Sequence, residues 1–145
     1  TRAGEAFPVR PSLKWLIAAY PLILLEEYLG QMANPVTADP MMTQFLTEWS
    51  WWQLTLAIVI AAPLAEEYVF RGVLLVWLHQ KIGEVGAVVL TAIGWAALHT
   101  QYDWVWMAVI AVAGLVLGLI RTRGGSLWLV IVIHAANNAV ALVGM

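Results

Sequence analysis

Apolar segments of helical length follow one another along most of this chain, and their succession constrains the fold more than any other sequence feature. Four of them run over about 49–80, 84–100, 104–120 and 126–143, and the connectors between them are short. A weaker stretch at 13–29 is interrupted by Pro21 and closed by Glu26 and Glu27. Because about 20 apolar residues cross a bilayer as a helix, the sequence predicts an all-α membrane bundle of about five transmembrane helices.

Few side chains in the sequence are charged. Only 11% of its 145 residues are Asp, Glu, Lys or Arg, whereas a water-soluble domain carries roughly 25%. The absence of Cys excludes a disulfide scaffold, a cysteine-ligated metal and a thiol nucleophile. The net charge is −2 and no basic stripe is present, so we expect no nucleic-acid partner. These features predict a single membrane domain over residues 1–145 that contacts membrane lipid.

The basic residues fall on one side of the predicted bundle. If five helices alternate in direction, this side contains Arg2, Arg10, Lys14, Lys81, Arg121 and Arg123, and the opposite side contains Asp39, Glu48 and Asp103. The positive-inside rule then places the basic side in the cytoplasm. The sequence therefore predicts a multi-pass integral membrane protein.

The segment that follows the first apolar stretch is polar. Residues 30–48 contain Asn-Pro and Asp-Pro dipeptides, which predict a loop rather than a helix. Glu26 and Glu27, just before it, are interpreted as a solvated interfacial pair, and the alternative is an acidic patch that receives substrate. Further along, Gly114 and Gly118 are four residues apart, which predicts close helix packing.

Polar residues inside the predicted helices indicate where the function lies. They are Glu66, Glu67 and Arg71 in the second helix, His99 in the third, and His134, Asn137 and Asn138 in the fifth. An ionisable group at the centre of a bilayer costs about 2.5 kcal/mol or more, so it marks a functional site by default. At ~1.5 Å of rise per residue, these groups lie roughly 12 to 22 Å from the inner ends of their helices. Three helices can therefore bring them together in the bundle interior.

The spacing within the second helix separates its two carboxylates. Glu67 and Arg71 are four residues apart, so they share a helix face and are expected to form an ion pair. Glu66 points about 100° away and has no basic partner on its own helix. We therefore expect Glu66 to act as the general base, with Glu67 and Arg71 in supporting positions.

The other two helices contribute imidazoles and a carboxamide. His134 and Asn138 are four residues apart and direct their side chains into one volume, an arrangement suited to a developing oxyanion. His99 can orient Glu66 or share its proton with a water molecule. A water-activating carboxylate, an imidazole and an oxyanion site together predict hydrolysis of an acyl or peptide bond.

Three short motifs carry a family resemblance. They are AEEYVFRG at 65–72, WAALH at 95–99 and HAANN at 134–138. In order and spacing they resemble the motifs of the CAAX prenyl protease and bacteriocin-processing family, also called CPBP or Abi, of glutamate-dependent intramembrane proteases. The resemblance covers about 51–145, which would be the catalytic core. Trp95 stands where the family more often has Phe, and we expect this difference to change packing rather than chemistry.

The resemblance implies an intramembrane endopeptidase without a metal cofactor. Glu66 would be the catalytic base, His99 its partner at the water, and His134 with Asn138 the oxyanion site. The substrate would be a protein or peptide with a membrane-associated segment: a prenylated tail, a bacteriocin leader or a C-terminal sorting segment. We expect a location in a bacterial plasma membrane, and a bacterial chain this small fits the latter two substrates at least as well as the first.

Two alternatives remain open at the level of sequence. Zinc can be bound by Glu and His side chains, so Glu66, Glu67, His99 and His134 are candidate ligands of a zinc-dependent protease. The HExxH motif is absent, however, and Arg71 would repel a cation. Alternatively, the same charges would form a proton or ion relay in a non-catalytic transporter or scaffold.

Overall fold

The computed structural model describes residues 40–124 and 126–144, together with a few isolated positions between 21 and 32. Every element within these ranges is a helix, which confirms the predicted all-α class. The elements are α2 (Pro40–Glu48), α3 (Trp51–Leu54), η2 (Thr55–Ala61), α4 (Ala62–Glu67), η3 (Tyr68–Leu74), α5 (Leu75–Ala97), α6 (Trp104–Gly124) and α7 (Leu127–Gly144). Most of the predicted helix at 13–29, including Glu26 and Glu27, lies outside the described residues, as do Arg2, Arg10 and Lys14.

Part of the predicted loop at 30–48 is helical. Helix α2 occupies Pro40–Glu48, so the loop prediction is wrong over these residues. The helix begins at Pro40, because proline is well suited to the first helical position, where its missing N–H costs no hydrogen bond. Gln44 Nε2 donates to Glu48 Oε1 at 3.0 Å one turn later. The Phe45 and Trp49 rings then pack edge to face at 5.4 Å, which fixes the exit from α2.

The helix from Trp51 onward contains two π-helical segments. In η2 and η3 the N–H groups bond carbonyls five residues back, as Ala62 does with Ala57 and Leu75 does with Phe70. Such turns are rare and frequently occur at functional sites. Helix α4 lies between them and carries both glutamates of the first motif. The two carboxylates therefore lie on a short α-helical turn with a wider helix on either side.

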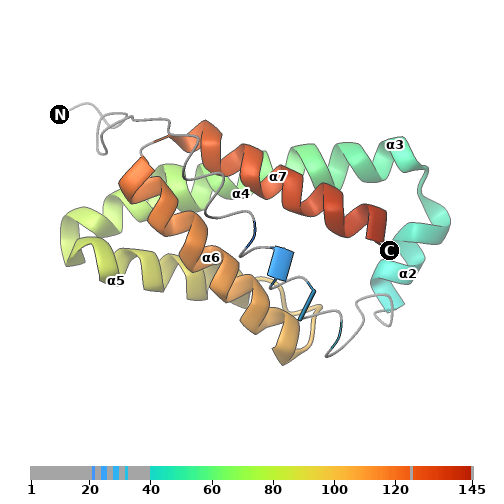
Figure 1. Cartoon of the computed structure of the whole chain (residues 1–145), viewed down its shortest axis with the longest axis horizontal. Helices are drawn as coiled ribbons and strands as arrows, with labels where there is room; N and C mark the ends of the chain where they lie inside the picture. Colours follow the sequence, from blue (N-terminus) through green and yellow to red (C-terminus); the bar gives the residue numbers. More distant parts are fainter. Residues whose placement is uncertain are drawn as a thin grey trace.

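A single glycine reverses the chain after this helix. Gly83 lies at φ 79° and ψ 177°, a conformation reserved for glycine. The helix direction changes there, in the predicted gap between the second and third apolar segments. The following part of α5 runs back along η3, against which it packs (Figure 1). The AEEYVFRG and WAALH motifs thus lie on two arms of one helical hairpin.

Helix α6 packs closely on α5 through the two predicted glycines. A Cβ atom at Gly114 would lie 3.1 Å from Ala92 Cα, and one at Gly118 would lie 3.1 Å from Val88 Cγ1. These contacts confirm the close packing predicted from the spacing. Helix α7 then packs on η2, α4 and α6 (Figure 1). The buried apolar cluster that joins these helices consists of Phe70, Trp95, Ala113, Leu117, Ile120, Val130 and Ile133.

Two helical segments in the described part are long and apolar enough to cross a membrane. They are Trp51–Ala97, with 47 residues, and Trp104–Gly124, with 21 residues. Leu127–Val143 is a shorter apolar helix. Large apolar side chains such as Val85, Trp104 and Val143 are at least 75% exposed, as expected where lipid rather than water surrounds the bundle.

Candidate active site

A fully buried ion pair forms the centre of the site. Arg71 Nη1 donates to Glu67 Oε1 at 2.7 Å, and both side chains have 0% exposure. The pair predicted from the four-residue spacing is therefore confirmed. His134 Nδ1 lies 2.9 Å from the same oxygen, Glu67 Oε1, and comes from α7. Glu67 thus receives one charged partner from its own helix and one imidazole from a distant part of the chain.

Arg71 also joins the first motif to α6. Its second terminal nitrogen, Nη2, donates to the Gly114 carbonyl at 3.1 Å. Its guanidinium carbon lies 4.5 Å from the centroid of the Trp95 ring, a favourable cation–π geometry. Its own backbone carbonyl accepts a hydrogen bond from Arg121 Nε at 3.3 Å. These contacts hold the guanidinium in one orientation.

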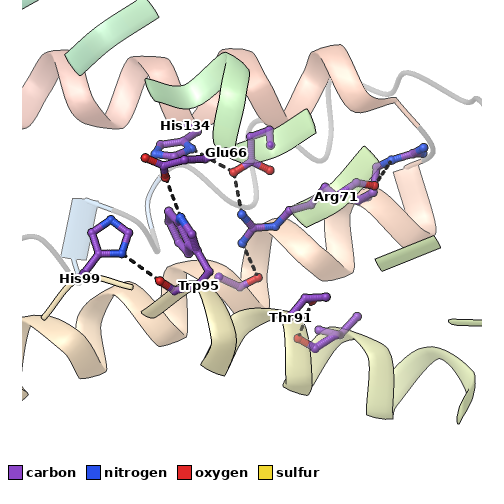
Figure 2. Close-up of polar contacts among 10 residues, drawn as sticks. Glu66, Arg71, Thr91, Trp95, His99 and His134 are labelled. Atoms are coloured by element: carbon purple, nitrogen blue, oxygen red, sulfur yellow. Dashed lines mark hydrogen bonds and ion pairs between the residues drawn. The ribbon is translucent and has the colours of Figure 1, made fainter. Parts of the chain in front are cut away.

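Glu66, the adjacent carboxylate, lies in a different environment. It is half-buried, and Trp95 Nε1 donates to its Oε2 at 2.6 Å. This bond links α4 to α5 (Figure 2). A phenylalanine at position 95 has no N–H to donate, so Trp95 has a polar contact that its interpretation as a packing residue did not include.

Both motif histidines contact the Trp95 ring. The His99 and His134 rings lie edge to face with it, at centroid distances of 5.4 and 5.1 Å. His99 Nδ1 is 2.9 Å from the Trp95 backbone carbonyl. Because a carbonyl can only accept, Nδ1 carries the proton there, and the lone pair of a neutral His99 is on Nε2. Figure 2 shows both imidazoles and the Glu66 carboxylate gathered around the indole.

The carboxylate partner of His134 determines which of its two ring nitrogens carries a proton. Its Nδ1 faces Glu67 Oε1, so Nδ1 is the protonated nitrogen. A neutral His134 therefore has an acceptor at Nε2, whereas the imidazolium form has a second donor there.

Asn138 lies one turn after His134 on α7 and reaches η2. Its Nδ2 donates to the Ile58 carbonyl at 2.9 Å, and its side chain is half-buried. This contact uses one of the two N–H bonds of the carboxamide. The structure thus brings Glu66, Glu67, Arg71, His99 and His134 around Trp95, with Asn138 at the junction of α7 and η2.

The donor set in the described part does not contain a metal-ligand cluster. No three Asp, Glu or His side chains there are grouped as they would be around an ion. One oxygen of Glu67, a candidate zinc ligand, already accepts from Arg71 and faces His134. This oxygen of Glu67 is therefore engaged in an ion pair with Arg71.

Sequence reasoning missed Trp95 as a polar member of the site. The available signal was its position, because Trp95 lies within an apolar segment whereas Trp49, Trp51, Trp104 and Trp128 lie at segment ends. A buried indole N–H needs an acceptor. The carbonyls of Ile58 and Gly114 could not have been identified, since every residue has one.

Fold and site together define a helical membrane protein with a buried carboxylate, guanidinium and imidazole cluster. Over residues 48–140 the chain matches the family model described as type II CAAX prenyl endopeptidase Rce1-like, and it belongs to this family of peptidases. It is also similar to a protein of Escherichia coli named "Uncharacterized 24.3 kDa protein", with 28% identity over 135 residues. The alignment covers 88% of this chain and 62% of that relative, so the chain spans less than two thirds of the relative's length. No solved structure matches the chain.

Proposed function

We propose that this chain is an intramembrane endopeptidase in which Glu66 activates water for attack on a peptide bond of a membrane-associated protein or peptide. One observation carries the proposal: two adjacent carboxylates lie in opposite environments. Glu67 is completely buried and ion-paired, whereas Glu66 is half-buried and accepts from one neutral donor. Glu67 therefore holds the site together, and Glu66 remains available for proton transfer.

The proposed reaction begins with proton transfer to Glu66. The carboxylate removes a proton from water while the water oxygen bonds to the scissile carbonyl carbon. The tetrahedral intermediate then collapses, the C–N bond breaks, and protonated Glu66 returns the proton to the leaving amine. His99 assists by accepting from the same water at Nε2, since its Nδ1 is bonded to the Trp95 carbonyl.

Two donors on α7 are proposed to stabilise the oxyanion. His134 would donate from Nε2 in its imidazolium form, while its Nδ1 stays bonded to Glu67 Oε1 at 2.9 Å. Asn138 donates through the N–H bond that the Ile58 carbonyl does not use. Donors held in place before the reaction contribute most to such stabilisation, because they need no reorientation as charge develops.

We propose five membrane passes, with the catalytic core at about 51–145. The segment Trp51–Ala97 has 47 residues, which as a straight helix would be about 70 Å long, more than twice the ~30 Å of the hydrocarbon core. The reversal at Gly83 divides it into two passes. Helices α6 and α7 add two, and the apolar stretch at 13–29 would add the first. The basic ends would face the cytoplasm of a bacterium.

The substrate is proposed to enter in an extended conformation, because a helix buries its carbonyls in its own hydrogen bonds. By family, the candidate substrates are a prenylated C-terminal tail, a bacteriocin leader or a C-terminal sorting segment. Comparing the processing of tails and leaders in cells that carry the wild-type chain or Glu66→Ala would distinguish them.

Metal independence is part of this proposal, and its support is the Arg71 guanidinium against Glu67. Purified protein is expected to keep its activity in a strong chelator. Activity lost on chelation and restored by zinc would instead establish the zinc-dependent alternative.

The decisive test is peptide cleavage by purified protein in detergent. Glu66→Gln should be inactive while its thermal unfolding stays close to that of wild type. Glu48→Gln is the matched control, since Glu48 is exposed at the end of α2 and should retain full activity. A folded, fully active Glu66→Gln variant would refute the role of Glu66. A wild-type protein without any cleavage activity would favour the transporter or scaffold.

A further inference from the structure

We infer that Trp95 is a positioning residue, whose indole N–H holds one oxygen of Glu66 so that the other faces water. This inference rests on the proposed catalytic role of Glu66. The bond is short, with Trp95 Nε1 at 2.6 Å from Glu66 Oε2, and a carboxylate acceptor makes it stronger than a bond between neutral groups. A carboxylate at the edge of a site would otherwise sample several rotamers.

The indole itself is fixed on several sides. Trp95 is only 4% exposed. The Arg71 guanidinium lies 4.5 Å from its ring centroid, and both imidazoles lie against it edge to face. On the α6 side, a Cβ at Gly114 would lie 3.1 Å from Trp95 Cε3, so the glycine is what lets the ring lie there. A donor held this tightly fixes the position of its acceptor.

This contact differs from the exposed position of most other tryptophans in the described part of the chain, although Trp106 is also buried, at 6% exposure. Trp49, Trp51, Trp52, Trp77, Trp104 and Trp128 are between 41% and 80% exposed. Trp95 has the opposite character, because its ring is buried and its N–H meets a carboxylate. If Trp95 acts through Glu66, its replacement should change kcat for the chemical step and not substrate binding, because its side chain is buried and bonds Glu66.

The hydrogen bond can be tested without measuring activity. In protein labelled with ¹⁵N at tryptophan, the indole signal of Trp95 is assigned as the one lost in Trp95→Phe. We expect this signal to move upfield in its proton dimension in Glu66→Gln, because a bond to a carboxylate becomes one to a neutral amide. Glu48→Gln should leave it unchanged. An unchanged Trp95 signal in Glu66→Gln would overturn the inference.

The positioning role is tested by removing only the N–H. Site-specific replacement of Trp95 by 3-benzothienylalanine keeps the ring shape and exchanges N–H for sulfur. We expect kcat for peptide cleavage to fall roughly ten- to a hundredfold, with KM within about twofold and the unfolding temperature close to that of wild type. The same replacement at the exposed Trp104 is the control and should change neither constant.

The positioning role of Trp95 and the catalytic role of Glu66 can be refuted separately. Unchanged kcat in the benzothienylalanine protein, or a raised KM at constant kcat, would overturn the positioning role and leave Glu66 as base. Full activity of Glu66→Gln together with a shifted Trp95 signal would refute the catalytic proposal, although the hydrogen bond exists.

Discussion

Glu67 and His134 are 67 positions apart in the chain, yet Glu67 Oε1 and His134 Nδ1 lie 2.9 Å apart in the buried centre of the bundle. The same oxygen accepts from Arg71. This one carboxylate oxygen therefore connects the first and third motifs and determines which nitrogen of His134 faces away from it.

Replacement of Glu67 alone should destabilise the fold. Glu67→Gln leaves the buried Arg71 without its counter-charge, and breaking a buried pair in this way costs about 3–5 kcal/mol. The double variant Glu67→Leu with Arg71→Met removes both charges and should be closer in stability to wild type than Glu67→Gln is. Unfolding in detergent with increasing SDS measures the difference. A double variant less stable than the single one would contradict this account of the pair.

Loss of the α7 donors should reduce activity more than stability. His134→Gln keeps a polar side chain, and Asn138→Ala removes the carboxamide. If each donor stabilises the oxyanion, each variant should lower kcat roughly 100-fold or more. Combining His134→Gln with Asn138→Ala should lower kcat by less than the product of the two single losses, because groups that act together in one step are not additive. Kinetics of the single and double variants provide the measurement, and multiplicative losses would refute a shared step.

Gly114 should tolerate no side chain. Gly114→Ala places a Cβ 3.1 Å from the Ala92 backbone and from Trp95 Cε3, and overpacking of this kind costs about 1–3 kcal/mol. The carbonyl that accepts from Arg71 would be displaced with α6, so activity should fall as well. Gly94→Ala is the matched control, since its nearest neighbour is Phe70 Cε1 at 4.0 Å. Equal effects of the two substitutions on unfolding temperature would contradict the packing argument.

Gly83→Ala should destabilise the hairpin through backbone conformation alone. No atom lies within 4 Å of a Cβ at this position, so the only penalty is the backbone angle φ of 79°. A residue with a Cβ in this region costs about 1–3 kcal/mol. The expected result is a lower unfolding temperature with an unchanged KM. A stability equal to that of wild type would show that the turn adopts another conformation.

Local spacing predicted several of these features correctly. Glu67 with Arg71, and Gly114 with Gly118, are relationships within a single helix, where a four-residue interval determines which side chains share a face. The gap between the apolar segments that end at about 80 and begin at about 84 was also predicted, and the reversal at Gly83 lies in it.

The spacing of residues within one helix does not predict which side chains of different helices meet. That Glu67, and not Glu66, meets His134 depends on the rotation of α4 against α7, which no interval within one helix determines. The bond from Trp95 to Glu66 has the same origin. Helix α2 was missed for a different reason, because an Asp-Pro dipeptide is compatible both with a loop and with the first turn of a helix.

The hairpin closed by Gly83 has a consequence for biogenesis. Its first arm carries Glu67 and Arg71, whose charges cancel within one turn of the same helix. During synthesis this arm can leave the translocon with Glu67 already paired, before α7 has been translated. His134 follows later in the chain, so Glu67 has its counter-ion before it acquires its imidazole partner.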